Sequence, residues 1–215
     1  MVKEMDKHEL QNYIANRASK ELTDGMLVNL GIGLPTKVAN FVDKSIHIIL
    51  QSENGFTGLD GEHQTEGYVN AGGAPVSIEK GGATFGSETS FGMIRGGHVD
   101  LTILGALQVD KYGNIASHVI PGKMVPGMGG AMDLLTGAKK VIVAMQHTNK
   151  GVHKILDECT LPLTGQRCVD LIITELGVIE VREDGLHVIE LGEDVTFEEI
   201  QEATGTKLVK AYEGA

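Results

Sequence analysis

The chain has 215 residues, and its 29 acidic side chains outnumber the 18 basic ones, for a formal net charge of −11 at pH 7. This excess of negative charge disfavours a nucleic-acid partner, because such a surface needs clustered cations. The opening residues are charged and no later apolar run approaches the roughly 20 residues that span a bilayer, so we expect a cytoplasmic protein with no membrane partner.

Cysteine, histidine and glycine usage narrows the class further. Cys159 and Cys168 show neither a disulfide framework nor zinc-ligand spacing, and the eight histidines are scattered, so no metal is predicted. The 29 glycines, about twice the usual share, gather in short clusters. Such clusters mark backbone with unusual torsions or close approaches, which favours an enzyme whose sites are built from loops.

The first 55 residues predict a helix followed by two strands with a helix between them. Apolar residues recur every four positions, which indicates an amphipathic helix over about 8–23. Residues 26–30 predict a strand and 31–35 a turn, with Pro35 beginning a second helix. The apolar run 46–50 is typical of a strand covered on both faces, and it leads directly into Ser-Glu-Asn-Gly.

The rest of the chain continues this alternation. Glycines interrupt every apolar run in 56–98, where we expect loops and short strands over the sheet edge. The further predicted elements are buried strands at 101–105 and 141–145, a helix at 131–138, a β pattern over 171–181, a hairpin over 178–191 turning at Asp184-Gly185, and a final helix from the capping box of Thr196 and Glu199 to Gly205. Together they predict one α/β domain over 1–215, with a largely parallel open sheet flanked by helices.

The strongest local feature is Glu53, a carboxylate directly after a predicted strand. Ligands of open α/β sheets bind beyond the carboxyl ends of the strands, so Glu53 stands where a functional group is expected. The alternative is a plain β-turn at Asn54-Gly55 with the glutamate facing solvent. Spacing alone leaves both interpretations open.

Three glycine clusters could bind anions or lie against a ligand. Gly127, Gly129 and Gly130 precede the helix at 131–138, where free N–H groups could stabilise a phosphate or an oxyanion, although a flexible connector fits equally well. The turn at 70–75 could hold a ligand or be only a turn. Gly31 and Gly33 match the first two glycines of a dinucleotide fingerprint, but Thr36 stands where the third belongs, which disfavours a nicotinamide site.

These motifs combine into a resemblance. The segments NLGIGLPT (29–36), LQSENGFTG (50–58), NAGG (70–73), FGMIRGGHVDLTILGALQV (91–109), IPGKMVPGMGGAMDL (120–134) and ECTLPLTGQ (158–166) resemble the B (beta) chain of family I CoA-transferases, nearly collinearly from about 20 to 195. The resemblance implies a glutaconate CoA-transferase-like fold, Glu53 as the nucleophile, and oxyanion stabilisation by Gly129 and Gly130, of which Gly130 is favoured. We expect CoA and substrate contacts at Ser52, Asn54, Gly55, Gly72, Gly73, Gly31 and Gly33.

The resemblance also implies a reaction and a partner. CoA would move between short-chain acids through a glutamyl-CoA thioester on Glu53, with coenzyme A as a substrate and no tightly bound cofactor. The acids would be of the acetate, butyrate or acetoacetate class, because Gly73-Ala74 stands where succinate-using members have Lys-Glu. An A (alpha) subunit would complete the site in an A2B2 heterotetramer.

One departure and three alternatives accompany this interpretation. Ser117-His118 replaces the usual Asn-Trp before IPGKM, and the chain has no tryptophan, which bears on the pocket lining. The alternatives are a succinyl-CoA:3-oxoacid CoA-transferase subunit, an acyl-CoA hydrolase on the same scaffold, and a non-catalytic ligand sensor. A carboxylate-acceptor assay separates transferase from hydrolase, and binding without turnover would identify the sensor.

Overall fold

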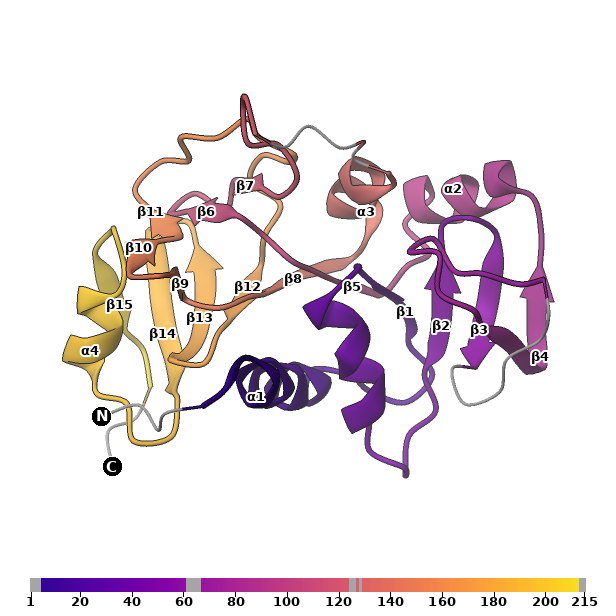
Figure 1. The fold of residues 1–215 in the computed structure, drawn as a ribbon, viewed down its shortest axis with the longest axis horizontal. Helices are drawn as coiled ribbons and strands as arrows, with labels where there is room; N and C mark the ends of the chain where they lie inside the picture. The colour runs from indigo at the N-terminus through magenta and orange to yellow at the C-terminus, as the bar shows by residue number, and fades with distance from the viewer. Residues whose placement is uncertain (1–4, 61–66, 124–126, 128, 213–215) are drawn as a thin grey trace.

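The computed structural model describes residues 5–60, 67–123, 127 and 129–212, and in these a ten-stranded sheet extends through the molecule (Figure 1). Across the sheet, the strands are β15 (Leu208–Lys210), β14 (Gly185–Leu191), β13 (Gly177–Arg182), β12 (Leu171–Ile173), β8 (Lys140–Ala144), β5 (Leu101–Leu104), β1 (Leu27–Leu30), β2 (Ile49–Ser52), β3 (Phe56–Asp60) and β4 (Ser77–Thr84). The two small sheets contain β9 (Thr148–Asn149) with β10 (Val152–His153), and β6 (Gln108–Asp110) with β7 (Ile115–Ala116) and β11 (Ile155–Leu156).

The centre of the sheet is parallel. Strands β12, β8, β5, β1 and β2 all run in one direction. On either side the chain adds antiparallel strands, β13 and β14 at one end and β3 and β4 at the other. The largely parallel open sheet expected from the sequence is therefore confirmed for its centre, and the carboxyl ends of the five central strands share one edge.

Helices cover both faces of this sheet. They are α1 (Lys7–Ser19), the 3₁₀ helix η1 (Leu34–Phe41), α2 (Ser87–Arg95), α3 (Ala131–Gly137) and α4 (Phe197–Glu202). Helices α1 and η1 pack on one face, and α2, α3 and α4 contribute to the core on the other. None of the helices in the described part of the chain combines the length and the apolarity that crossing a membrane would take.

Strands β8 and β12 each supply both cores by alternation. On β8, Val141 and Val143 belong to the core beneath α2 and α3, whereas Ile142 and Ala144 belong to the core beneath α1. Side chains of a strand point to opposite faces in turn, so a strand covered on both sides is apolar throughout. The strands predicted at 101–105 and 141–145 are confirmed, each within one residue.

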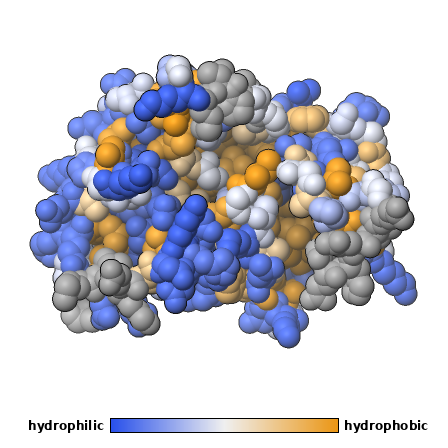
Figure 2. Space-filling view, viewed as in Figure 1, coloured by the Kyte–Doolittle hydropathy of each residue, from blue (hydrophilic) through white to orange (hydrophobic). Residues whose placement is uncertain are grey.

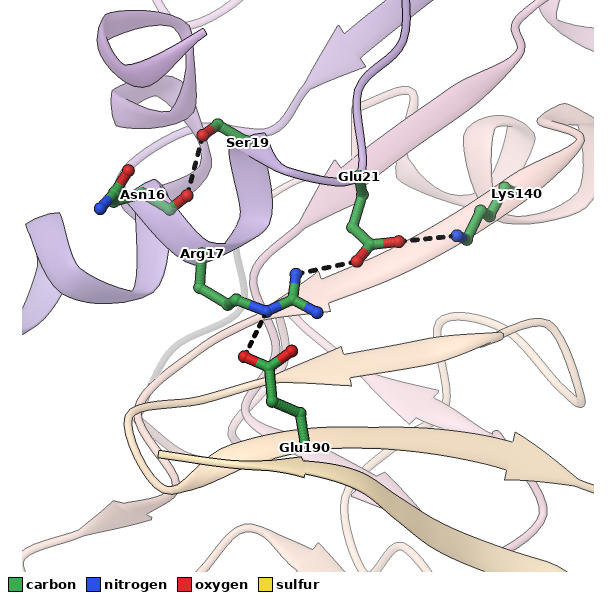
Figure 3. A network of polar contacts seen from close by, with 6 residues as sticks. All are labelled: Asn16, Arg17, Ser19, Glu21, Lys140 and Glu190. Atoms are coloured by element: carbon green, nitrogen blue, oxygen red, sulfur yellow. Dashed lines mark hydrogen bonds and ion pairs between the residues drawn. The ribbon is translucent and has the colours of Figure 1, made fainter. Parts of the chain in front are cut away.

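Helix α1 confirms the first predicted helix but ends at Ser19 instead of residue 23. Figure 3 shows how its last turn is tied to the sheet. Arg17 contacts Glu21 and Glu190 of β14, each at 2.8 Å, and Lys140 of β8 donates to Glu21 at 2.9 Å. Burial alone would raise the pKa of Glu21, but the hydrogen bonds from Arg17 and Lys140 outweigh it and keep that pKa below its ordinary value.

The C-terminal predictions hold with small shifts. Strands β13 and β14 form the hairpin around Asp184, and the capping box of Thr196 and Glu199 begins α4, which ends at Glu202, before Gly205. The helix at 131–138 is confirmed as α3. Strand β15 was not predicted, and the helix after Gly33 is 3₁₀ instead of α.

Two predictions were wrong. The strand placed at 46–50 is β2 at Ile49–Ser52, shifted by about three residues towards the carboxyl end. The segment 56–98, expected to hold only loops and short strands, contains helix α2 and the eight-residue strand β4. Residues 61–66 of this segment lie outside the described residues. Both errors occur where polar side chains are among the buried ones, Gln51 and Ser52 on β2 and Ser90 on α2.

Candidate active site

Glu53 follows the last residue of β2 and lies at the edge where the central parallel strands end. A tight turn comes directly after it. Gly55 donates its N–H to the carbonyl of Ser52 at 3.0 Å and has φ of +118°. A Cβ at residue 55 would collide with the Phe85 carbonyl oxygen, so the turn needs glycine for both torsion and space.

The structure brings Glu53 to the glycine pair that precedes α3. The Gly130 N–H donates to Glu53 Oε1 at 3.3 Å, and the Glu53 side chain is half-buried. A Cβ at Gly130 would lie 3.1 Å from Glu53 Cδ, and one at Gly129, where φ is +54°, would lie 3.5 Å from Oε1. The bare backbone at Gly130 therefore lets the carboxylate lie against a peptide N–H. Residues 124–126 and 128 of this motif lie outside the described residues.

Ser52 and Asn54 hold the neighbouring loop. Ser52 Oγ donates to Asn54 Oδ1 at 2.7 Å and accepts the Ala71 N–H at 3.0 Å, while Asn54 Nδ2 donates to the Val69 carbonyl at 2.8 Å. These bonds attach the 69–71 segment to the turn that carries Glu53. The Ser52 hydroxyl is buried and committed to the protein, and Asn54 is exposed.

Gly72 and Gly73 form a tight turn capped by Asn70. The Asn70 Oδ1 accepts the Gly72 N–H at 2.9 Å, and Gly73 has φ of +79°. A Cβ at Gly72 would lie 3.2 Å from Ile32 Cγ1, so this turn lies beside the loop that follows β1. The turn and that loop therefore meet near the end of β2.

The two glycines of the loop after β1 differ. Gly31 donates to the Ile103 carbonyl at 2.8 Å, and a Cβ there would lie 3.0 Å from Leu104 Cδ2. Close packing against β5 thus explains this glycine without any ligand. Gly33 has φ of +90° at the start of η1, with no described atom within 4 Å of a Cβ built there.

Apolar side chains are exposed on the segments around Glu53. Ile32 is 72% exposed, and Tyr68, Val69 and Met132 are between 39% and 46% exposed. Figure 2 shows apolar residues in the hollowed centre of one face, bordered by hydrophilic ones. Large exposed apolar groups around a half-buried carboxylate are typical of a surface that another molecule covers.

Three polar residues beneath the site were not predicted. Asn29, Gln51 and Ser90 are buried and form a continuous hydrogen-bonded chain to the Ser52 carbonyl. The available signal was an asparagine inside the apolar run 26–30 and a glutamine directly after 46–50. Polar residues in strands covered on both faces need buried partners, and these partners lie under Glu53.

Ser117 and His118, the pair that departs from the family pattern, share one partner. Thr164 Oγ1 accepts the Ser117 N–H at 3.0 Å and lies 2.9 Å from Ser117 Oγ and 3.0 Å from His118 Nδ1. Thr164 is buried at 2% exposure. The pair therefore joins the strand β7 region to the 164–165 segment.

Comparison with known proteins identifies the family of this chain. The Coenzyme A transferase family profile matches residues 11–203. The beta subunit of acetate CoA-transferase from Haemophilus influenzae is 52% identical over 92% of this chain and 91% of its own length. The corresponding chain of a probable succinyl-CoA:3-ketoacid coenzyme A transferase from Bacillus subtilis is 47% identical over 91% and 93%.

The fold has a matching solved structure. Glutaconate coenzyme A-transferase from Acidaminococcus fermentans superposes with a TM-score of 0.71 at 20% identity, over 95% of this chain and 88% of its own. Fold and similarity thus define an α/β transferase subunit. The chain belongs to the coenzyme A transferase family, as the B (beta) chain of a family I enzyme.

Proposed function

We propose that this subunit transfers CoA between short-chain acyl-CoA and carboxylic acids through a glutamyl-CoA thioester on Glu53. The observation that carries the proposal is the 3.3 Å contact between Glu53 Oε1 and the Gly130 N–H, at the carboxyl edge of the parallel strands. A carboxylate repels an anionic ligand, so it is unsuited to a site that only binds one. A nucleophile, by contrast, must face the thioester that it attacks.

The steps balance without a cofactor. A Glu53 carboxylate oxygen attacks the acyl-CoA carbonyl carbon and the C–S bond breaks. CoA departs as a thiolate, and Glu53 becomes an acyl-glutamyl anhydride. The thiolate then attacks the glutamyl carbonyl, which releases the first acid as a carboxylate and forms the glutamyl-CoA thioester. An incoming carboxylate repeats both steps in reverse, so that a new acyl-CoA leaves and the Glu53 carboxylate is restored.

Gly130 would stabilise the charge that builds at each attack on the glutamyl carbonyl. The addition of a nucleophile to the glutamyl carbonyl leaves a negative charge on its oxygen, the atom that faces the Gly130 N–H in the resting state. Removal of one such donor costs about 3–4 kcal/mol in other enzymes. A carboxylate is a weak nucleophile, so help of this size decides whether transfer is fast.

The relatives supply two candidate substrate classes. One relative is named for acetate CoA-transferase and the other for a probable succinyl-CoA:3-ketoacid transferase. We favour short monocarboxylic acids such as acetate, butyrate and acetoacetate, because Gly73-Ala74 stands where succinate-using members of the family have Lys-Glu. Succinyl-CoA with a 3-oxoacid is the second candidate.

An alpha subunit would complete the site. The relatives carry beta or B in their names, which implies such a partner, and for the two chains we propose A2B2 assembly. Glu53 is only half-buried in this chain, and apolar side chains near it are exposed, so a covering chain would exclude the water that hydrolyses a glutamyl thioester.

The test traps the intermediate. The chain is co-expressed with its alpha subunit, the purified complex is incubated with acetoacetyl-CoA or butyryl-CoA without acceptor acid, and intact-mass and peptide spectra are recorded. We expect a CoA adduct on Glu53 that hydroxylamine removes. An assembled complex without an adduct contradicts the mechanism, and faster release to water than to added acetate would instead identify a hydrolase.

A further inference from the structure

A row of polar side chains crosses the sheet directly beneath the site. In the strand register, Asn29 of β1 pairs with Gln51 of β2 on one side and with Thr102 of β5 on the other. Their strand neighbours Val28, Leu101 and Ile103 belong to the core beneath α1. By alternation the polar row points to the opposite face, into the core that α2 covers.

The row continues as a hydrogen-bonded chain that ends at the nucleophile's own peptide. Asn29 Nδ2 donates to Gln51 Oε1 at 2.7 Å, Gln51 Nε2 donates to Ser90 Oγ at 2.7 Å, and Ser90 Oγ donates to the Ser52 carbonyl at 3.1 Å. Asn29, Gln51, Ser52 and Ser90 are between 0% and 4% exposed. All three donors point the same way, so each bond polarises the next.

The Ser52 carbonyl belongs to the peptide unit that leads into Glu53. It accepts two hydrogen bonds, from Ser90 Oγ and from the Gly55 N–H at 3.0 Å. A peptide is planar, so fixing its carbonyl also fixes the direction from which the Glu53 Cα leaves the strand. The side chain then starts from a defined point towards Gly130.

Helix α2 also touches the other half of the site. Arg95 Nε donates to Asp133 Oδ1 of α3 at 2.7 Å, and a Cβ at Gly137 of α3 would collide with the Ile94 carbonyl. Helix α3 begins directly after Gly130, the N–H donor. One short helix therefore contacts both the strand that ends at the nucleophile and the helix that starts at the donor.

The polar row is a poor device for stability. A buried polar chain gains little over well-packed apolar residues, and the Thr102 hydroxyl has no partner among the described residues, which lowers stability. What such a chain supplies is a unique orientation at its end. Here that end is the peptide bond of Glu53.

We propose that Ser90 is a positioning residue that sets the Glu53 carboxylate against Gly130, with Gln51 and Asn29 orienting the Ser90 hydroxyl. The inference rests on the proposed function, because it assigns Ser90 a role in forming the Glu53 adduct. Loss of the hydroxyl frees the Ser52 carbonyl from one of its two donors and lets the carboxylate sample unproductive positions.

The experiment compares two buried serines in the alpha-beta complex. Ser90→Ala is matched by Ser19→Ala, because Ser19 is also buried and also donates to a backbone carbonyl, that of Asn16 at 2.8 Å, but on α1 (Figure 3). We expect Ser90→Ala to slow single-turnover adduct formation by about 10- to 100-fold, the scale of a small misplacement of reacting groups, with the KM for acyl-CoA within about twofold. Ser19→Ala should keep the wild-type rate.

A conservative variant and the wild type separate the possible failures. Ser90→Cys keeps a weaker donor of similar size and should give an intermediate rate; if Ser90→Ala does not assemble, this variant alone carries the test. A wild-type rate in assembled Ser90→Ala or Ser90→Cys, with the Glu53 adduct present in the wild type, overturns the positioning role only. Absence of the adduct in the wild type overturns the proposed function itself.

Discussion

Two glutamates lie at the same edge of the sheet and have different surroundings. Glu53 directly follows β2, and Glu175 lies two residues beyond β12, a strand parallel to β2 through β8, β5 and β1. Glu53 is half-buried with its carboxylate against the Gly130 N–H. Glu175 accepts the His147 N–H at 2.9 Å, and burial raises the pKa of its carboxyl.

The surroundings of Glu175 are closed by side chains. Both ring nitrogens of His147 are paired at 2.8 Å, Nδ1 with Thr174 and Nε2 with Thr204 of the α4 region. Burial lowers the pKa of His147 to about 4 and that of Lys154 to about 8. The carboxyl end of a strand thus holds a carboxylate in both places, and the packing around it leaves Glu53 partly accessible while it encloses Glu175.

The most direct test of the difference between Glu53 and Glu175 is to remove each carboxylate charge in turn. Glu53→Gln should abolish adduct formation and lower transfer at least about 1000-fold, because an amide cannot form the anhydride. Glu175→Gln should retain transfer and alter only stability. Turnover and intact mass of both alpha-beta complexes are the measurements. Persistent transfer by Glu53→Gln would show that another residue is the nucleophile.

The bare backbone at Gly130 is the second target. A methyl group there would lie 3.1 Å from Glu53 Cδ and force the carboxylate away from its donor. We expect Gly130→Ala to lower transfer by about 100- to 1000-fold, the scale of one lost oxyanion donor. Gly105→Ala is the matched control at the same edge, since no described atom lies within 4 Å of its Cβ. Equal losses in the two variants would refute this explanation.

Acid should destabilise the folded protein through His147, which lies beside Glu175. The folded pKa of His147 is about 4 against an ordinary 6.5, so its contribution is present above pH 6.5 and is lost as the pH falls through about 4. The loss amounts to about 3 kcal/mol in the free energy of unfolding. The raised pKa of Glu175 opposes it, because protonating that carboxyl relieves its buried charge.

The measurement is urea unfolding at pH 7 and pH 4 for the wild type and for His147→Asn. The wild type should lose more stability on acidification than His147→Asn, whose side chain does not titrate, and all other groups cancel between the two proteins. Parallel losses in both would show that His147 is not the acid-sensitive group.

The smallest expected effect concerns the polar row under Glu53. Thr102→Val replaces a hydroxyl that has no partner in the described part of the chain with a methyl group of similar size, so the free energy of unfolding should rise by about 1 kcal/mol while transfer stays unchanged. Thermal unfolding and the transfer assay measure the two quantities. Lower stability of Thr102→Val would show that the hydroxyl has a partner. Loss of transfer activity would show that it has a role in the reaction.

The pairing of Glu53 with Gly130 was expected from the family resemblance, whereas the strand patterns by themselves placed only Glu53 at the edge of the sheet. Apolar runs at 101–105 and 141–145 indicated parallel strands, whose carboxyl ends meet at one edge, and the motif at 120–134 matched the family. The structure places Glu53 Oε1 beside the Gly130 N–H. The catalytic roles of both residues, and the CoA contacts, stay predictions.

The errors arose where polar residues occupy core positions. Helix α2 buries only Ser90 and Ile94, has Gly92 inside it and follows Gly86, so it shows no apolar periodicity. Strand β2 was placed too early because its most buried residues are Gln51 and Ser52. Sequence rules equate burial with apolarity, and here they failed at Gln51, Ser52 and Ser90, which are polar and buried.

The turn after Glu53 has a consequence for how the protein ages. Asn-Gly pairs deamidate when the glycine nitrogen attacks the asparagine side-chain carbonyl, and the new aspartate or isoaspartate would add a negative charge next to Glu53. Here the Gly55 N–H is held by the Ser52 carbonyl, and the Asn54 amide is held by Val69 and Ser52. The folded turn therefore protects the Asn54 side chain from deamidation, and samples stored in denaturant should accumulate the deamidated form far sooner than native ones.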